Sequence, residues 1–166
     1  FMHSLAALEP DLVMNTGDNL SHVDGMGPLL EALDPLMDFP GVFVPGSNCY
    51  FAPVFKNPAR YLWQPRTPQM IEEGSRVALP IERMHDAFES RGWTGLINRY
   101  DTLNLKGLRL EFSGVDDPHL RYDEHPGFAP GAFDEGQEPS VRIGVAHAPY
   151  MRTLYRFVQD GAQAIF

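Results

Sequence analysis

The chain has 166 residues, which is enough for one domain with a hydrophobic core and too few for two domains of ordinary size. Its formal net charge of -9 argues against a nucleic-acid-binding protein, which would carry a basic patch, and against an electrostatic membrane anchor. Cys49 is the single cysteine, so the chain forms no internal disulfide, and no apolar run approaches the roughly 20 residues of a membrane span. A cytoplasmic location is favoured. Because the sequence opens inside an expected helix, we expect a trimmed chain, and a signal or anchor before Phe1 stays open.

Hydrophobic periodicity predicts helices and strands in an alternating order. The expected elements are, in chain order, a helix from Met2 to Leu8, a strand over 12–16, a helix over 27–37 interrupted at Pro35, a strand over 41–44, a helix over 80–91, strands over 100–105 and 108–112 forming a hairpin, a strand over 141–146, a helix over 151–160 and a strand from 164. A long surface loop is expected over 114–139, and an ordered, aromatic-rich segment over 49–68. Parallel crossovers around an antiparallel hairpin predict an α/β sandwich with a mixed sheet.

Two of the expected strands end in short polar turns. Leu12–Thr16 is followed by Gly17-Asp18-Asn19, and Gly41–Pro45 is followed by Gly46-Ser47-Asn48. A strand-helix-strand crossover joins parallel neighbours, so both turns are expected on the same edge of the sheet. Open α/β sheets place their functional sites at that edge.

Three side chains at the expected strand ends are candidate metal ligands, namely Asp18, Asn48 and His147. Taken singly, Asp and Asn in such places more often form turns or caps, and a lone histidine is more often a hydrogen-bonded structural group. Together they indicate a metal site, because oxygen and imidazole ligands suit Mn, Fe, Zn or similar ions.

These residues carry a resemblance to a known family. The calcineurin-like metallophosphoesterases have the signature D-x-H, G-D, G-N-H-[DE], a histidine, and G-H-x-H. The segments Gly17–Asn19, Gly46–Cys49 and Gly144–Pro149 resemble its second, third and fourth blocks, and the resemblance spans essentially the whole chain. It implies a metallophosphoesterase-like four-layer α/β/β/α sandwich with mixed sheets, incomplete at both ends. It also implies that two divalent metal ions share Asp18, and that His147 binds one of them.

The sequence departs from the family signature in three places. The first block, D-x-H, is absent because the chain begins after its expected place, and the last, G-H-x-H, is absent because Phe166 lies just before it, so on its own the chain is expected to hold metals weakly or not at all. Ser47 stands where the family has its metal-binding Asn, and Asn48 stands where it has a phosphate-contacting His. A one-residue shift would let Asn48 supply the ligand, which makes Asn48 the candidate catalytic residue as well as a candidate ligand. Cys49 occupies the acidic position.

The chemistry implied by the resemblance is hydrolysis of a phosphomonoester or phosphodiester substrate. Two cations about 3.5–4 Å apart would orient the phosphoryl group and lower the pKa of a bridging water toward about 7. The acidic composition agrees with this, because metals rather than lysines would neutralise the substrate. The alternative is a metallophosphoesterase-like domain that has lost its site and serves as a binding or structural module, which the altered segment Gly46–Cys49 favours.

Other candidate residues receive less weight. Arg60 could reach a phosphate, but a solvated surface position is favoured. Asp116, Asp117 and His119 form the densest ligand-like cluster, and a loop-ordering role is favoured because the family places its metals elsewhere. The sequence contains no G-x-S-x-G elbow, no phosphate-binding G-x-x-x-x-G-K-[ST] loop and no arginine placed after Cys49 for a cysteine phosphatase.

Overall fold

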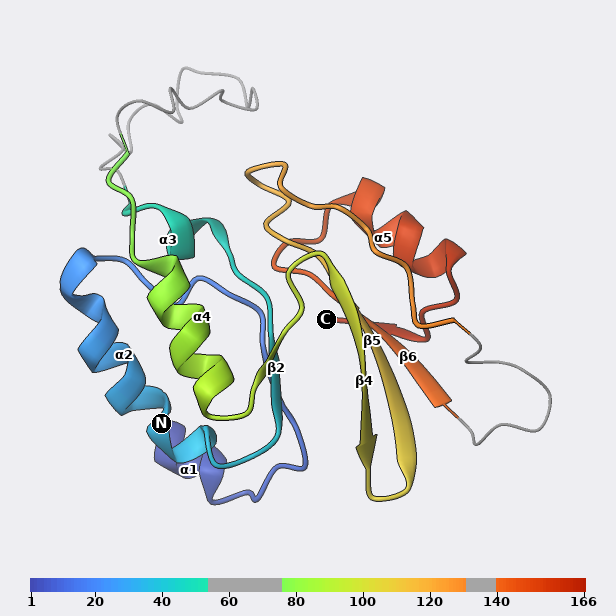
Figure 1. Ribbon diagram of the computed structural model, residues 1–166, viewed down its shortest axis with the longest axis horizontal. Helices are drawn as coiled ribbons and strands as arrows, with labels where there is room; N and C mark the ends of the chain where they lie inside the picture. The colour runs from blue at the N-terminus through green and yellow to red at the C-terminus, as the bar shows by residue number, and fades with distance from the viewer. Residues whose placement is uncertain (54–75, 131–139) are drawn as a thin grey trace.

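The computed structural model describes residues 1–53, 76–130 and 140–166, which form an α/β fold with two β-sheets (Figure 1). The α-helices are α1 (Met2–Ala6), α2 (Met26–Leu33), α3 (Ser47–Tyr50), α4 (Ile81–Ser90) and α5 (Met151–Gln159). Short 3₁₀ helices are η1 (Val23–Gly25) and η2 (Asp34–Leu36). The strands are β1 (Val13–Asn15), β2 (Gly41–Phe43), β3 (Thr94–Gly95), β4 (Arg99–Leu105), β5 (Leu108–Gly114), β6 (Ser140–Val145) and β7 (Ala164–Ile165).

The first sheet has the order β1-β2-β3 and is parallel throughout its described strands. Val13 pairs with Gly41 and Asn15 with Phe43, so β1 and β2 end together. This sheet departs from the expectation of mixed sheets, and the strand β3 is absent from the elements predicted from the sequence. A two-residue strand has too few positions to show a hydrophobic period, so pairing with β2 decides its conformation.

The second sheet has the order β4-β5-β6-β7 and is mixed, as expected. β4 and β5 form the predicted antiparallel hairpin, and β5, β6 and β7 are parallel. The hairpin turns at Lys106 and Gly107, whose φ angles are 49° and 83°. Positive φ at both central residues belongs to the tight turn whose twist matches that of the two strands.

Three groups of buried side chains hold the fold together. The first lies between the helices and the first sheet and includes Leu33, Met84, Phe43, Phe88 and Trp93. The second joins the two sheets and includes Val42, Val44, Leu96, Phe112 and Val145. The third includes Val115, Ala146 and Phe157 and packs α5 on the second sheet. Figure 1 accordingly shows α2 and α4 on one side of β2, the strands β4–β6 on its other side, and α5 beyond them.

The predicted helices begin and end close to the expected residues, for local reasons. α4 buries Met84 and Phe88, one turn apart, while Glu82, Arg83, Asp86, Glu89 and Ser90 are exposed. α2 ends at Leu33, and Pro35 lies in the following 3₁₀ turn, because its ring cannot continue an α-helix. None of the described helices has the length and hydropathy that a membrane span requires.

Two expectations concern segments that the structure describes in part. Residues 115–130 contain no described helix or strand, as predicted, but Val115, Asp116 and Asp117 are buried, so the prediction of a surface loop is wrong at this point. Residues 131–139 lie outside the described part. Most of the predicted aromatic segment, with Arg60, also lies outside it.

Candidate metal centre

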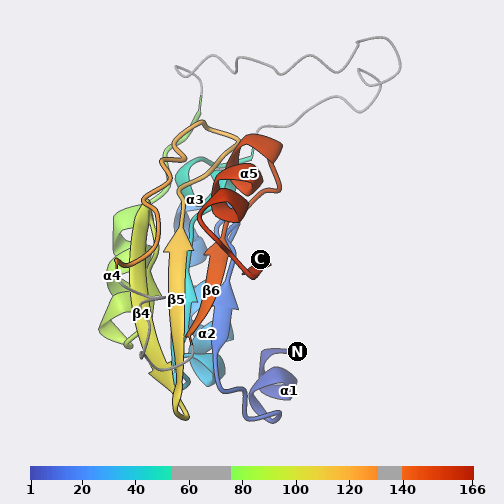
Figure 2. The same cartoon turned by 90° about the vertical axis from the view of Figure 1, so that its right-hand side faces the viewer.

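Strand ends carry the predicted ligands to one end of the molecule. β1 and β2 are parallel and in register, so the segments after them leave the first sheet on the same edge. In Figure 2 the strands β5 and β6 run toward the end of the molecule where α3 and α5 lie. Asp18 follows β1, Asn48 follows β2 and His147 follows β6. The two sheets therefore deliver these side chains to a common place.

Two glycines allow the loops after β1 and β2 to touch. Gly17 has a φ of 101°, and a Cβ there would lie 2.5 Å from the backbone nitrogen of Gly46. A Cβ at Gly46 would collide with Oδ1 of Asp18 and would lie 2.6 Å from Cε1 of His147. Asp18 itself has a φ of 56°, a left-handed conformation that short polar residues tolerate. The glycines thus leave the space in which Asp18 and His147 meet.

Asn48 holds the carboxylate of Asp18 through two hydrogen bonds. Its backbone N–H donates to Oδ1 over 2.9 Å, and its side-chain Nδ2 donates to Oδ2 over 2.8 Å. Asn48 is the second residue of α3 and so belongs to a short helix rather than the open loop that the sequence suggested. Each carboxylate oxygen has two lone pairs, so both retain capacity for a cation. Of Ser47 and Asn48, it is Asn48 that contacts Asp18.

The ring of His147 is oriented by a backbone carbonyl. Nδ1 lies 2.7 Å from the carbonyl oxygen of Thr16, which can only accept, so Nδ1 carries the proton and donates. In the neutral ring this leaves the lone pair on Nε2, which lies 3.4 Å from Oδ1 of Asp18. Metal-binding histidines are usually oriented by such a hydrogen bond from their other nitrogen. The donor atoms of Asp18 and His147 therefore fit a divalent cation.

The loop after β5 brings Asp117 and His119 to the same end. Oδ1 of Asp117 accepts a hydrogen bond from the backbone N–H of His119 over 2.9 Å and lies 3.3 Å from its Nδ1. The Asp117 side chain is fully buried, and its Oδ2 has no hydrogen-bond partner among the described residues. Asp117, His119 and His147 each offer one ligand atom, and these atoms lie within 4.8 Å of one another.

A hydrogen bond ties this loop to α3. The hydroxyl of Tyr50 donates to the carboxylate of Asp116, with 2.7 Å to each oxygen. Burial raises the pKa of Tyr50, and its bond to Asp116 raises that pKa further. Burial also raises the pKa of Asp116, although the Tyr50 hydrogen bond opposes the rise. On α4, burial lowers the pKa of His85, against the opposing charge of Asp116.

The structure thus brings Asp18, Asn48 and His147 together, and their metal-binding role stays a prediction. Cys49 is buried, and its Sγ accepts the backbone N–H of Asn19 over 3.4 Å. Asp117 has the loop-ordering contact that the sequence analysis expected, but it also lies beside His147. The sequence held one signal for this proximity: Asp117 and His147 each follow a predicted strand. The sequence does not show that these two strands, β5 and β6, are parallel neighbours.

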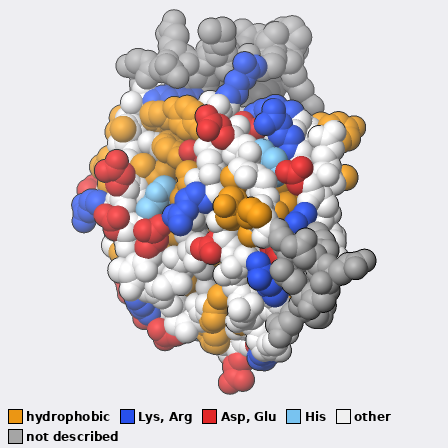
Figure 3. Space-filling view, turned by 45° about the vertical axis from the view of Figure 1, so that its right-hand side comes forward, with side chains coloured by type: hydrophobic (Ala, Val, Ile, Leu, Met, Phe, Trp, Pro, Cys, Tyr) orange, Lys and Arg blue, Asp and Glu red, His pale blue; other side chains and the backbone are white. Residues whose placement is uncertain are grey.

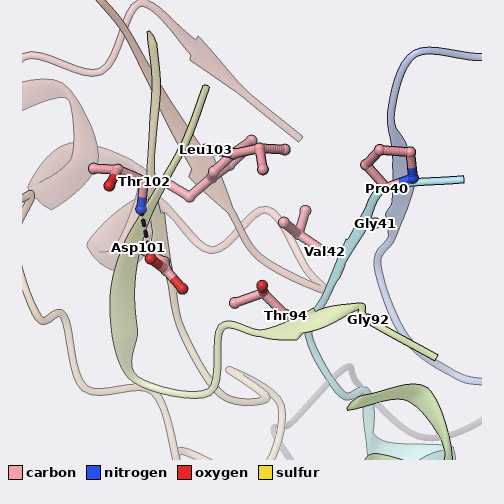
Figure 4. A pocket seen from close by; sticks show the side chains of 9 residues that line it. Pro40, Gly41, Val42, Gly92, Thr94, Asp101, Thr102 and Leu103 are labelled. Carbon is pink, nitrogen blue, oxygen red and sulfur yellow. Dashed lines mark hydrogen bonds between the residues drawn. The ribbon is translucent and has the colours of Figure 1, made fainter. Parts of the chain in front are cut away.

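A cavity elsewhere in the molecule lacks comparable chemistry. A space of ≈ 50 Å³ between the sheets lies where β2 and β3 begin, away from the strand ends that carry Asp18. Asp101 is the one ionisable residue in its lining, and its carboxylate accepts the backbone N–H of Thr102 over 2.7 Å (Figure 4). No group of polar side chains converges there, so this cavity is a packing feature.

Charges of both signs share the surface of the described residues. On the face in Figure 3, basic side chains are interspersed with acidic and histidine side chains, and the described part of this face shows no broad basic area.

Comparison with known proteins does not assign the chain to a family. No protein-family model matches the sequence, and no curated protein matches it. The resemblance to metallophosphoesterases therefore rests on Gly17-Asp18, the Gly46 loop and His147.

Proposed function

We propose that the chain belongs to a metal-dependent phosphoesterase that hydrolyses phosphomonoesters or phosphodiesters. The observation that carries the proposal is the approach of Asp18 Oδ1 to Nε2 of His147, with the proton of the His147 ring held on Nδ1 by Thr16. Three successive layers of core packing also support the proposed four-layer α/β/β/α sandwich.

The residues of the chain have separate tasks in this proposal. Asp18 offers a carboxylate that two cations can share, and Asn48 holds it in position. His147 offers a neutral imidazole nitrogen. Bound divalent cations supply Lewis acidity toward the phosphoryl group and a more acidic water. Asp18, Asn48 and His147 together provide too few ligands for two cations, so the proposal requires further ligands of the D-x-H and G-H-x-H kind.

The test uses the natural gene product with the residues on both sides of this sequence. With Mn²⁺ present, we expect hydrolysis of an aryl phosphate diester that falls by about 100-fold or more in Asp18→Asn. The matched control is Asp24→Asn, since the Asp24 side chain is 88% exposed and pairs only with His22 in the described part of the chain. Equal activity in Asp18→Asn and the unaltered protein would refute the bridging role. Flanks that encode neither D-x-H nor G-H-x-H would refute the enzyme.

A second candidate is a binding or structural module built on the same fold. It is favoured by the Asn48 hydrogen bonds, which satisfy both oxygens of Asp18 without a cation. A module of this kind would show metal-independent folding and no hydrolysis above that of Asp18→Asn.

A further inference from the structure

The buried carboxylate of Asp117 is incompletely satisfied by the described residues. The side chain is 0% exposed, and Oδ1 accepts the N–H of His119 while Oδ2 has no hydrogen-bond partner. Leaving a carboxylate oxygen unpaired away from water is costly. The ion pair that Asp117 makes in the described part of the chain is with His119, whose charge depends on protonation. A bound cation would supply the missing partner.

The two neighbouring imidazoles complete a suitable donor set. The rings of His119 and His147 lie 5.7 Å apart, centre to centre, and the ligand atoms of the two rings and Asp117 fall within 4.8 Å of one another. Two imidazoles and one carboxylate form the protein part of many zinc sites that keep a position open for water or substrate. Ligand atoms around zinc stand roughly 3.3 Å apart, at bond lengths of about 2.0–2.2 Å. His119, half exposed, can close the remaining distance.

The surroundings hold the donors in place. The guanidinium of Arg152 on α5 donates to the carbonyl of Pro118 and to Asp123, each over 2.7 Å, and so fixes the loop between Asp117 and His119 from outside. The ring of Tyr150 packs edge-on against His119 at 5.3 Å. The ion pair of Arg152 is with Asp123, and the ion pair of Asp117 in the described part of the chain is with His119. Because these contacts already hold the loop in place, binding a cation would cost little conformational entropy of the loop.

We infer that Asp117, His119 and His147 form a binding site for one divalent cation of the zinc type. His147 supplies Nε2, since its Nδ1 is engaged by Thr16. The inference rests on the proposed function in one respect, the use of His147 as a ligand. It adds Asp117 and His119, which the family resemblance does not assign, and it requires no ligand from outside this sequence.

The test measures metal binding by the 166-residue chain, without an activity assay. Titration with Co²⁺, followed by its visible absorption, should show one bound ion in a site of low coordination number, and Zn²⁺ should displace it. The variant His119→Ala should weaken binding by about tenfold or more, because it removes one of three ligands. The matched control is His22→Ala, an exposed histidine of the same chain that should bind as the unaltered protein does.

A second variant tests the carboxylate of the site. Asp117→Asn should also weaken binding by about tenfold or more, because an amide replaces the charged ligand, whereas Asp24→Asn, at a side chain that is 88% exposed, should bind as the unaltered chain does. His119→Ala binding as tightly as the unaltered chain would overturn the inference, as would an equal loss in Asp24→Asn. Absence of saturable binding would overturn it as well. The phosphoesterase proposal would survive each of these results, since its test is activity in the longer protein.

Discussion

Oδ1 of Asp18 lies 3.4 Å from Nε2 of His147, although Asp18 follows a strand of the first sheet and His147 follows a strand of the second. Their meeting depends on Gly46, which faces both side chains. The hydrogen bond from His147 to Thr16 joins the end of β6 to the segment after β1, so the same histidine links the two sheets and completes the candidate centre.

Gly46→Ala should damage this meeting point. The added Cβ collides with Oδ1 of Asp18 and with the ring of His147. Backbone and ring must shift, so we expect the free energy of unfolding to fall by about 2 kcal/mol. Urea unfolding followed by circular dichroism measures this change.

Gly27→Ala is the matched control. A Cβ there meets nothing within 4 Å, and Gly27 lies within α2. This change should leave the free energy of unfolding within about 0.5 kcal/mol of the unaltered protein, because the helix propensity of alanine is offset by the crowding of its Cβ against the ring of Pro28. Equal effects of the two substitutions would contradict the role given to Gly46.

Tyr50→Phe should loosen the loop after β5. The change removes the hydroxyl that donates to Asp116, whose carboxylate is 8% exposed. Hydrogen bonds to charged groups contribute about 1.5–3 kcal/mol, so we expect a loss of about 2 kcal/mol near pH 7. Tyr122→Phe is the control, because Tyr122 packs against Tyr50 but is 39% exposed, and we expect a change below about 0.5 kcal/mol.

The effect of Tyr50→Phe should also depend on pH. The Tyr50 hydrogen bond lowers the pKa of Asp116, so its removal raises that pKa further above the ordinary range of an aspartic acid. A group whose pKa is raised in the folded state contributes stability at low pH that is lost as the pH rises. The destabilisation should therefore be larger at about pH 7 than at about pH 4. A constant difference would argue against an ionised Asp116 as the partner of Tyr50.

His85→Phe should reduce acid sensitivity. Burial lowers the pKa of His85 below the ordinary histidine value of 6.5, although Asp116, Glu89, Asp86 and Glu82 act in the opposite direction. As the pH falls, the side chain of residue 85 therefore binds a proton at a higher pH in the unfolded chain than in the folded chain. His85 thus lowers the free energy of unfolding as the pH falls through 6.5. Phenylalanine removes the titrating group, including the buried Nε2 that has no hydrogen-bond partner among the described residues, and keeps an aromatic ring against Phe43. Urea midpoints at about pH 8 and about pH 5 should move closer together in the variant, and an unchanged separation would contradict the assignment.

The sequence alone determined the elements whose pattern is local. Exposure alternates along β4, whereas β5 is buried on both faces from Leu110 onward. Lys106-Gly107 indicates the tight turn between them. Pro35 ends α2 because proline has no backbone N–H to donate and its ring clashes with the preceding turn of a helix, whatever surrounds it. Gly17-Asp18 could be recognised as a strand-end turn because the tolerance of glycine for positive φ is a property of the residue itself.

The tertiary structure decided which of these local features share a site. β3 forms because β2 offers an edge, which no pattern in two residues can indicate. Asn48 became part of a short helix that holds Asp18. Asp117 and His119 read as loop residues in the sequence, because their proximity to His147 depends on the parallel pairing of β5 with β6. Ligand sets assembled from loops of two sheets are properties of strand pairing and packing, and sequence spacing does not encode them.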